Sequence, residues 1–142
     1  MSDALQRMLS PKSIAIVGVS SDFNKLNGRP MKFLLDKGYA GAIYPVNPKY
    51  EEIAGIKCYP SVLDLPEPVD LAVVAVPAKV VLDTITQLGE AKVASAVIFS
   101  SGFGEMGSEG KALEEAVAVA AREGDVRICG PNCLGLINAF EG

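Results

Sequence analysis

Short apolar runs alternate with amphipathic segments along the 142-residue chain. An apolar run without polar alternation is typical of a strand buried on both faces, as in a parallel sheet. By this criterion the sequence predicts five strands, at residues 13–18, 42–46, 70–76, 95–99 and 126–129. Because helical segments separate most of these runs, we expect parallel strands joined by helical crossovers.

Three intervening segments have the spacing of an amphipathic helix, with apolar residues three and four positions apart. A proline in the first turn and a glycine after the last turn indicate where such helices begin and end. The predicted helices are residues 28–37, with Pro30 in the first turn; a helix with the face Val81, Leu82, Ile85 and Leu88, ended by Gly89; and a helix that Ser108 caps and Gly124 ends.

The expected fold is therefore α/β, a Rossmann-like, open, mostly parallel, doubly wound sheet of about five strands or more. Near residues 50–60 the alternation is interrupted, and Gly55 predicts a small hairpin or arm, followed by a helical turn that begins at Ser61. We expect one domain over residues 1–142, with residues 1–10 as an N-terminal lead and residues 139–142 as the start of a linker.

Composition narrows the functions that such a fold can serve. A formal net charge of −4 gives no electrostatic footprint for nucleic acid, so we do not expect that class of partner. No apolar run approaches the roughly 20 residues of a membrane helix, and the first residues have no apolar signal core, so no membrane association is expected. The three cysteines are then expected to be reduced thiols in the cytoplasm.

Histidine is absent from the chain. Its absence removes the commonest general base and the commonest metal ligand, and a nucleophilic Cys133 would have no histidine partner. Cys129 and Cys133 are not spaced as C-x-x-C and have no further paired cysteine, so a metal or redox role is not favoured. The sequence predicts no metal site and no catalytic residue.

Ligands of open parallel sheets bind beyond the carboxyl ends of the strands, so the loops that follow the strands form the candidate site. The loop after the first strand begins with Gly18 and is small, polar and basic through Ser20 and Lys25. It departs from the dinucleotide fingerprint G-x-G-x-x-G, because Ser20 and Phe23 replace the second and third glycines. Backbone N–H groups and hydroxyls before a helix favour phosphate binding over a plain connecting loop.

The loop after the second strand has Asn47 and Lys49 where an NAD enzyme usually has an acidic residue for the ribose hydroxyls. An amide and a lysine argue against NAD and favour an adenosine ligand with an extra phosphate near its ribose. NADP and coenzyme A, which carries a 3′-phosphate, both fit this pattern. The alternative for Lys49 is a solvated lysine in a turn.

Val76 and Pro77 follow the third strand. They offer a rigid apolar surface against which an adenine ring could lie, although a proline that starts a helix is the simpler explanation. Asn132, in the tight turn after the fifth strand, offers both a donor and an acceptor to a ligand.

Ser100, Ser101 and Gly102 open a glycine-rich loop after the fourth strand. Glycines in this loop permit close approach of the backbone to a ligand. Glu105 in the same loop is a candidate general base, but a lone loop carboxylate is more often solvated.

Six short motifs follow one another along the chain: Gly18-Val19-Ser20 with Lys25 and Gly28, then IYPVNPK at residues 43–49, IAGIKCY at 53–59, VDLAV at 69–73, SSGF at 100–103 and GPNCLG at 130–135. Each is weak alone, but the ordered set is specific. It resembles the N-terminal CoA-binding domain of NDP-forming acyl-CoA synthetases, the superfamily of ADP-forming acetate–CoA ligases and the succinyl-CoA synthetase α subunit. The resemblance extends over residues 9–138.

The resemblance implies coenzyme A as the ligand, with its ADP part held across the strand ends. It assigns the residues to successive parts of the ligand. Gly18 opens the phosphate loop, and Ser20 and Lys25 would contact phosphates. Asn47 and Lys49 would contact the ribose and the 3′-phosphate, and Val76 and Pro77 would contact the adenine. The pyrophosphate and pantetheine would lie along Ser100, Ser101 and Gly102, and the thiol end would lie near Asn132.

The chain also departs from this family. Family members pass a phosphate to a histidine on a following domain and use an ATP-grasp domain, whereas this chain has no histidine and stops at Gly142. We therefore expect it to bind CoA or acyl-CoA while a phosphohistidine domain and an ATP-grasp domain, in the same or another chain, complete an acid–CoA ligase. The alternatives are a stand-alone CoA-binding or regulatory protein, the CoA-binding part of a protein acyltransferase, and an NADP-dependent oxidoreductase.

Overall fold

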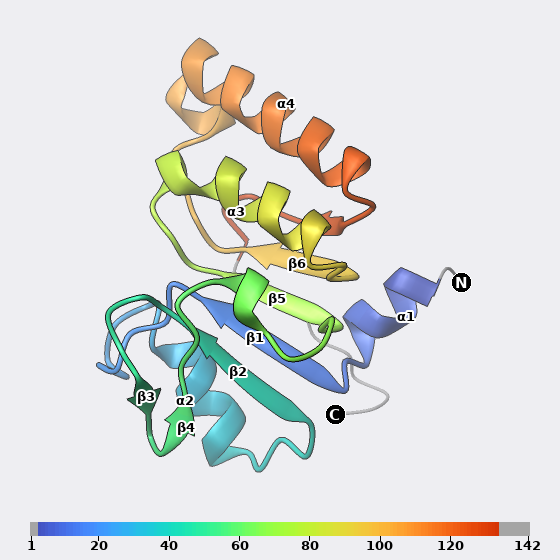
Figure 1. The fold of residues 1–142 in the computed structure, drawn as a ribbon. Coiled ribbons are helices and arrows are strands. Elements are labelled where there is room, and N and C mark those ends of the chain that lie inside the picture. The colour runs from blue at the N-terminus through green and yellow to red at the C-terminus, as the bar shows by residue number, and fades with distance from the viewer. Residues whose placement is uncertain (1–2, 134–142) are drawn as a thin grey trace.

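The computed structural model describes residues 3–133 of the chain. Five strands form one parallel sheet in the order β2-β1-β5-β6-β7 (Figure 1). All five predicted strands are confirmed, each within two residues of its expected ends. Their bounds are β1 Ser13–Val17, β2 Ala42–Val46, β5 Leu71–Val74, β6 Ser95–Ile98 and β7 Arg127–Cys129.

Helices cover both faces of the sheet (Figure 1). On one face lie α3 (Ala78–Glu90) and α4 (Ser108–Glu123), and on the other α1 (Asp3–Leu9) and α2 (Arg29–Asp36). This arrangement confirms the Rossmann-like, doubly wound α/β fold that the sequence predicts.

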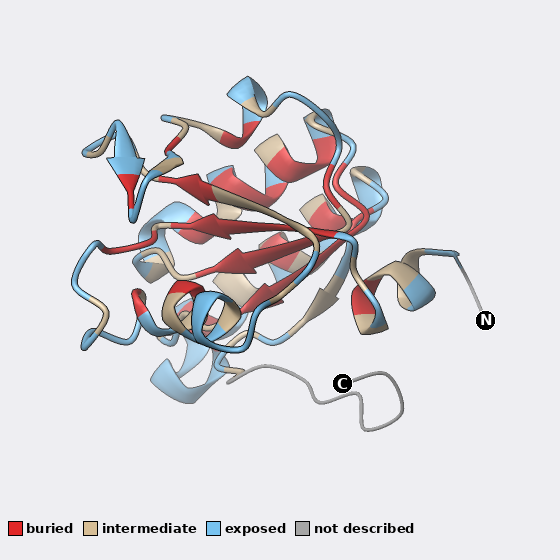
Figure 2. Ribbon diagram, turned by 90° about the horizontal axis from the view of Figure 1, so that it is seen from below, coloured by how far each residue is buried: buried red, intermediate tan, exposed pale blue. Residues whose placement is uncertain are grey.

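Alternate residues of each strand pack into two separate cores, because successive side chains of a strand point to opposite faces. In β1, Ala15 and Val17 face the α3–α4 side, whereas Ile14 and Ile16 face the α2 side. Figure 2 shows the buried strands running through the centre of the molecule, with exposed residues on the outer helix faces. Burial on both faces explains why the strands are uniformly apolar in sequence.

A small arm covers the outer edge of β2. It contains the predicted hairpin, formed by β3 (Glu52–Ile53) and β4 (Ile56–Lys57), and then η1 (Val62–Asp64), a 3₁₀ turn that Ser61 caps as expected. Between them, Tyr59 pairs with β2: its N–H donates to the Pro45 carbonyl and its carbonyl accepts from the Asn47 N–H, both at 2.9 Å. Pro45 therefore has its missing N–H on the outer edge, where no bond to β1 is lost.

Two predicted helix ends are wrong, for different reasons. Gly89 does not end α3 but lies within it, where a Cβ would come within 2.8 Å of the Gly124 Cα; its role is close packing of α3 on α4. Ser108 makes no capping hydrogen bond and is the first residue of α4; the residue before it is Gly107, with φ of 91°. Gly124 does end α4.

The expected N-terminal lead contains a short helix, α1, that the sequence pattern did not predict. Met8 of this helix is buried, and the Arg7 guanidinium forms an ion pair with the Asp70 carboxylate just before β5. Among the described helices, none combines the length and hydropathy that crossing a membrane requires. The expected linker at residues 139–142 lies outside the described residues.

Candidate functional site

The candidate site lies at the point in the sheet where the strand order reverses. The chain moves from β1 to β2 on one side and later returns to β5 on the other, so a crevice is expected beyond the carboxyl ends of β1 and β5. Gly18 follows β1 with φ of 83°, and a Cβ there would lie 2.6 Å from the Ala75 carbonyl oxygen and 2.8 Å from Val76 Cγ1. Only glycine allows the chain to pass this close to the end of β5.

Hydrogen bonds within the β1–α2 loop hold it in one conformation. The Asn27 side chain donates to the Gly18 carbonyl at 2.9 Å, and the Ser20 N–H donates to the Asn27 carbonyl at 3.2 Å. Ser20 is only 6% exposed, and its hydroxyl oxygen accepts from the Asp22 N–H at 3.0 Å. The Ser20 hydroxyl thus orders the loop from within, whereas Lys25 is exposed.

Tyr50 joins this loop to the end of β2, and the sequence analysis did not identify it. Hydrogen bonding with the Ser21 hydroxyl, and then with the Ser21 backbone and the Ser20 hydroxyl, lowers the pKa of Tyr50, and the charge of Lys25 acts in the same direction. The signal available in the sequence was the position of Tyr50 directly after Lys49. The phenol adds a polar group beside the predicted phosphate loop.

Asn47 and Lys49 differ in how far their side chains are already engaged. The Asn47 amide donates to the Val19 carbonyl at 2.8 Å and accepts from the Lys49 N–H at 2.9 Å. Asn47 therefore fixes the β2 end against the β1 loop and retains one N–H and one lone pair. Lys49 is exposed, and its ammonium group forms no ion pair within the described residues.

A cleft of about 270 Å³ opens at the ends of β1, β5 and β6. Four predicted residues line it together, and Leu26 adds an apolar side chain that is 54% exposed. The cleft is slightly smaller than ligand pockets of roughly 300–1,000 Å³, so it suits one ring or chain of a ligand while the rest lies over the loops. The lining residues are Leu26, Asn27, Ala75, Val76, Pro77, Ala78, Phe99, Ser100 and Ser101.

The loop after β6 is fixed by two polar side chains. The Ser100 hydroxyl donates to the Val76 carbonyl, which joins the ends of β5 and β6. The Glu105 carboxylate accepts from the Gly102 N–H, and backbone donors of Gly102, Glu105 and Phe103 lower the pKa of Glu105. Glu105 is thus an anion held by backbone N–H groups, an arrangement that does not suit the suggested general base.

The turn after β7 is attached to the end of β6. Gly130, with φ of 110°, has no room for a Cβ, which would lie 2.6 Å from the Ile98 carbonyl oxygen. The Asn132 N–H donates to the Ser100 carbonyl at 2.9 Å, and the Asn132 side chain is exposed. Asn132 therefore stands beside the cleft.

The predicted residues form two adjoining groups. Val76, Pro77, Ser100 and Ser101 share the cleft, with Asn132 attached through Ser100 and Gly18 packed against the end of β5. The second group surrounds the β1 and β2 ends, and Asn27, which lines the cleft and also bonds to Ser20, connects the two groups. No other predicted residue lines the cleft, and Gly102 belongs to neither group. The second group consists of Ser20, Lys25, Asn47 and Lys49, with Tyr50.

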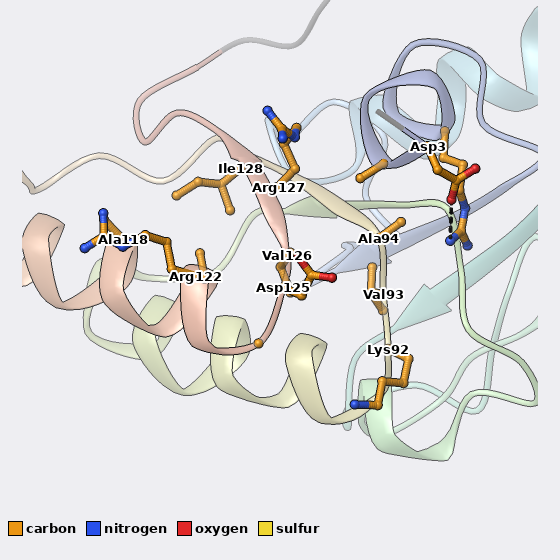
Figure 3. Close-up of a pocket in the computed structure, with 14 residues that line it drawn as sticks. Asp3, Lys92, Val93, Ala94, Ala118, Arg122, Asp125, Val126, Arg127 and Ile128 are labelled. Carbon is orange, nitrogen blue, oxygen red and sulfur yellow. Dashed lines mark ion pairs between the residues drawn. The ribbon is translucent and has the colours of Figure 1, made fainter. Parts of the chain in front are cut away.

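A larger cavity, of about 850 Å³, lies at the opposite, amino edge of the sheet, between α1, α4 and the starts of β6 and β7 (Figure 3). Of its four cationic side chains, Arg7 is paired with Asp3 and Asp70, and Lys92, Arg122 and Arg127 point away from one another rather than toward a common centre (Figure 3). None of the predicted site residues lines it. The strand-end cleft is therefore the better candidate site.

Comparison with known proteins identifies what this arrangement is similar to. The family described as "CoA binding domain" matches residues 12–139. Acetate–CoA ligase [ADP-forming] I of Archaeoglobus fulgidus is 48% identical over 94% of this chain and 19% of the ligase. The chain thus spans about a fifth of the length of that curated relative.

Solved structures with the same fold differ greatly in length. Apo dinucleotide forming acetyl-coenzyme A synthetase 1 of Ca. Korarchaeum cryptofilum has a TM-score of 0.86 and 42% identity, covering 90% of this chain and 28% of the synthetase. A hypothetical protein of Pyrococcus horikoshii OT3 has a TM-score of 0.70 and 29% identity, covering 93% of this chain and 84% of that protein. The fold therefore occurs both within long synthetases and in chains little longer than itself.

Proposed function

The chain belongs to the family of CoA-binding domains, and from this premise we propose that it is the part of an acid–CoA ligase that holds coenzyme A for thioester formation. The observation that carries the proposal is the cleft at the ends of β1, β5 and β6, which combines apolar walls with the polar side chains of Asn27, Ser100 and Ser101. A ligand with an aromatic ring, several phosphates and a flexible arm needs this combination.

The start of α3 is a favourable position for a negatively charged part of the ligand. This helix begins at Ala78, on the wall of the cleft, and its N-cap residue Pro77 provides no side-chain acceptor for the first N–H groups. Unpaired N–H groups and the helix dipole favour an anion at this position. An acidic chain can hold an anionic ligand in this way, by local geometry.

We assign the parts of CoA along the two groups of residues. The adenine would lie against Leu26, Val76 and Pro77, the apolar side chains that line the cleft. The pyrophosphate and then the pantetheine arm would pass Ser101 and Gly102 toward Asn132. Phosphates would lie near Ser20, Lys25 and Tyr50, and the 3′-phosphate near Lys49.

The chemistry of the ligase would come from other domains. The chain contains no histidine to accept a phosphate, and Glu105, the candidate base, is bound to backbone N–H groups. We propose that a phosphohistidine domain and an ATP-grasp domain supply these steps, in the same chain or in another, and that the assembly works in the cytoplasm.

The complete reading frame and its product test the ligase assignment. We expect it, alone or with a neighbouring gene, to encode a histidine-bearing domain and an ATP-grasp domain. The purified product should form a thioester only when an acid, CoA and a nucleoside triphosphate are all present. Thioester formation without nucleotide, or CoA binding by a protein with no such domains, contradicts the ligase proposal.

The second candidate is a stand-alone CoA-binding protein. It is favoured by the similarity to the hypothetical protein of Pyrococcus horikoshii OT3, of which this fold makes up 84%. A frame that ends close to Gly142, with CoA affinity retained and no ligase activity in any reconstituted mixture, supports this candidate instead.

Calorimetric titration of the wild type and Lys49→Ala with CoA and dephospho-CoA tests the ligand assignment. We expect the wild type to bind CoA about tenfold more tightly than dephospho-CoA, since one exposed charge-assisted contact contributes about 1–1.5 kcal/mol. Lys49→Ala should remove most of this preference and leave dephospho-CoA affinity unchanged. NADP and ATP should bind more weakly than CoA.

Lys37→Ala is the matched control for this titration, because Lys37 is an exposed lysine at the far end of α2. It makes the same change in charge and should keep the preference for CoA. If Lys49→Ala and Lys37→Ala behave alike, Lys49 does not contact the 3′-phosphate.

Glu105→Gln should bind CoA about three- to tenfold more tightly than the wild type. In the wild type, the Glu105 carboxylate accepts from the Gly102 N–H at the edge of the site, and its negative charge repels a phosphate of the ligand. The amide removes that charge and keeps an oxygen that can accept from the Gly102 N–H. Glu109→Gln, an equal change in charge in the first turn of α4, should have a smaller effect in the same titration. Equal or weaker binding by Glu105→Gln contradicts the placement of a ligand anion near Gly102.

A further inference from the structure

Two thiols meet at the end of β7. Cys129 is the last residue of β7 and Cys133 lies four residues further on, with the two Sγ atoms 3.6 Å apart. Both residues are half-buried and both are in the thiol form. Sulfurs at this distance need only a small movement to reach the bonding separation of about 2.0 Å.

The backbone holds the two thiols together. The Cys133 N–H donates to the Ile98 carbonyl at 3.1 Å, and the Asn132 N–H donates to the Ser100 carbonyl at 2.9 Å. Cys129 is fixed separately, because β7 pairs with β6 and Cys129 lies opposite Val97. The neighbouring end of β6 thus positions both cysteines, so their proximity does not depend on the side chains alone.

The third cysteine has different surroundings. Cys58 lies beside the β2 edge of the sheet, opposite to β7, and is only 4% exposed. Its Sγ donates to the Asn47 carbonyl oxygen at 3.5 Å, and it forms no contact with another cysteine within the described residues. Cys58 therefore serves as an internal control for thiol chemistry in the same molecule.

We propose that Cys129 and Cys133 are a redox modification site, which hydrogen peroxide converts to an intramolecular disulfide. One thiolate attacks the peroxide oxygen and becomes a sulfenic acid, and hydroxide leaves. The second sulfur then attacks the sulfenic sulfur, the S–S bond forms and water leaves. Two thiols and one hydrogen peroxide thus give one disulfide and two waters. Exchange with a dithiol reverses the change.

The pKa of Cys129 makes oxidation of the pair slow at neutral pH. Burial, and then the hydrogen bond and charge of Cys133, raise the pKa of Cys129. Since the thiolate is the reacting form, oxidation of the pair should become faster as the pH rises from neutral. In a reducing compartment the dithiol is the resting state.

Disulfide formation would change the candidate site through the turn after β7. Drawing the sulfurs together pulls on the segment between them, which contains Asn132 and is bonded to Ser100 on the cleft wall. We expect the oxidised protein to bind CoA several-fold more weakly than the reduced protein. This consequence rests on the proposed function, whereas the disulfide itself does not.

Peptide mapping of the peroxide-treated full chain tests the disulfide. Trypsin cleaves after Lys57 and Arg127, so Cys58 falls in one peptide and Cys129 and Cys133 share another. After treatment with one equivalent of hydrogen peroxide and alkylation, the shared peptide should lack two hydrogens and both alkyl groups. The Cys58 peptide should remain alkylated, and dithiothreitol should restore the reduced pattern. Sulfinic acids in place of the disulfide, or equal oxidation of Cys58, would overturn the proposal.

Two variants separate the disulfide from other oxidation. Cys129→Ser and Cys133→Ser should each prevent loss of the two hydrogens, and peroxide should no longer change their CoA affinity. If the disulfide forms and CoA affinity is the same before and after, the coupling to the cleft is refuted. If neither form binds CoA, the proposed function fails, and the mass of the shared peptide still decides whether the disulfide exists.

Discussion

Replacing Gly18 with alanine is expected to lower the free energy of unfolding by about 3 kcal/mol, through backbone strain and overpacking together. The φ of 83° is unfavourable for any residue with a side chain, and the new Cβ would lie within 3 Å of the Ala75 carbonyl oxygen and Val76 Cγ1. Urea denaturation followed by circular dichroism measures the change as a lower midpoint at constant slope. Because Gly18 sets the distance between the ends of β1 and β5, CoA affinity should also fall.

Gly38→Ala is the matched control, since Gly38 has φ of 67° and no atom within 4 Å of the position of a Cβ. Gly38→Ala introduces the backbone strain but no steric clash, so it should lower the free energy of unfolding by about 1 kcal/mol. The difference between the two variants measures the close approach of β1 to β5. If both variants lose the same stability, the packing at Gly18 is looser than the distances indicate.

Pro77→Asp is expected to weaken CoA binding by about thirtyfold, or about 2 kcal/mol, while leaving the stability of the fold nearly unchanged. Pro77 is the exposed N-cap residue of α3, with φ of −56° and ψ of 146°, and it lines the cleft. Aspartate is a favoured N-cap residue, and its capping bond should offset the loss of proline's rigidity. Its carboxylate, however, would repel a ligand that carries phosphates.

Pro77→Ser provides the comparison, because serine also caps a helix but has no charge. It should lose only the contact with the proline ring, and titration should give a reduction of about three- to fivefold in affinity. Equal losses for the two variants would show that the ring contact, not the charge, decides binding. No loss in either variant would remove the cleft wall at Pro77 from the CoA site.

The sheet could be predicted from the sequence because every strand is buried on both faces, and such strands appear as apolar runs. The helix ends were less predictable. Gly89 and Gly124 are the same residue type, yet Gly89 allows α3 and α4 to pack closely and Gly124 ends α4. Only the spatial neighbours distinguish these roles. Helix α1 was missed because a short helix depends on tertiary contacts, here the burial of Met8.

The candidate site was predictable as a set of strand ends, but not as a set of contacts. The sequence places Asn47 and Ser100 after their strands correctly, yet it cannot show that Asn47 already bonds to the Val19 carbonyl or Ser100 to the Val76 carbonyl. These bonds join residues far apart in the chain. The same holds for Tyr50 and for the two sulfurs of Cys129 and Cys133, which come together only in the folded chain.

The pairing of Tyr59 with β2 has a consequence for solubility. An edge strand with unpaired N–H and C=O groups is a template on which another chain can add a strand and aggregate. Along β2, Pro45 has no N–H to offer, and Tyr59 already takes the Pro45 carbonyl and the Asn47 N–H. The arm thus protects this edge of the sheet, and a chain without it would be prone to edge-to-edge association during folding and storage.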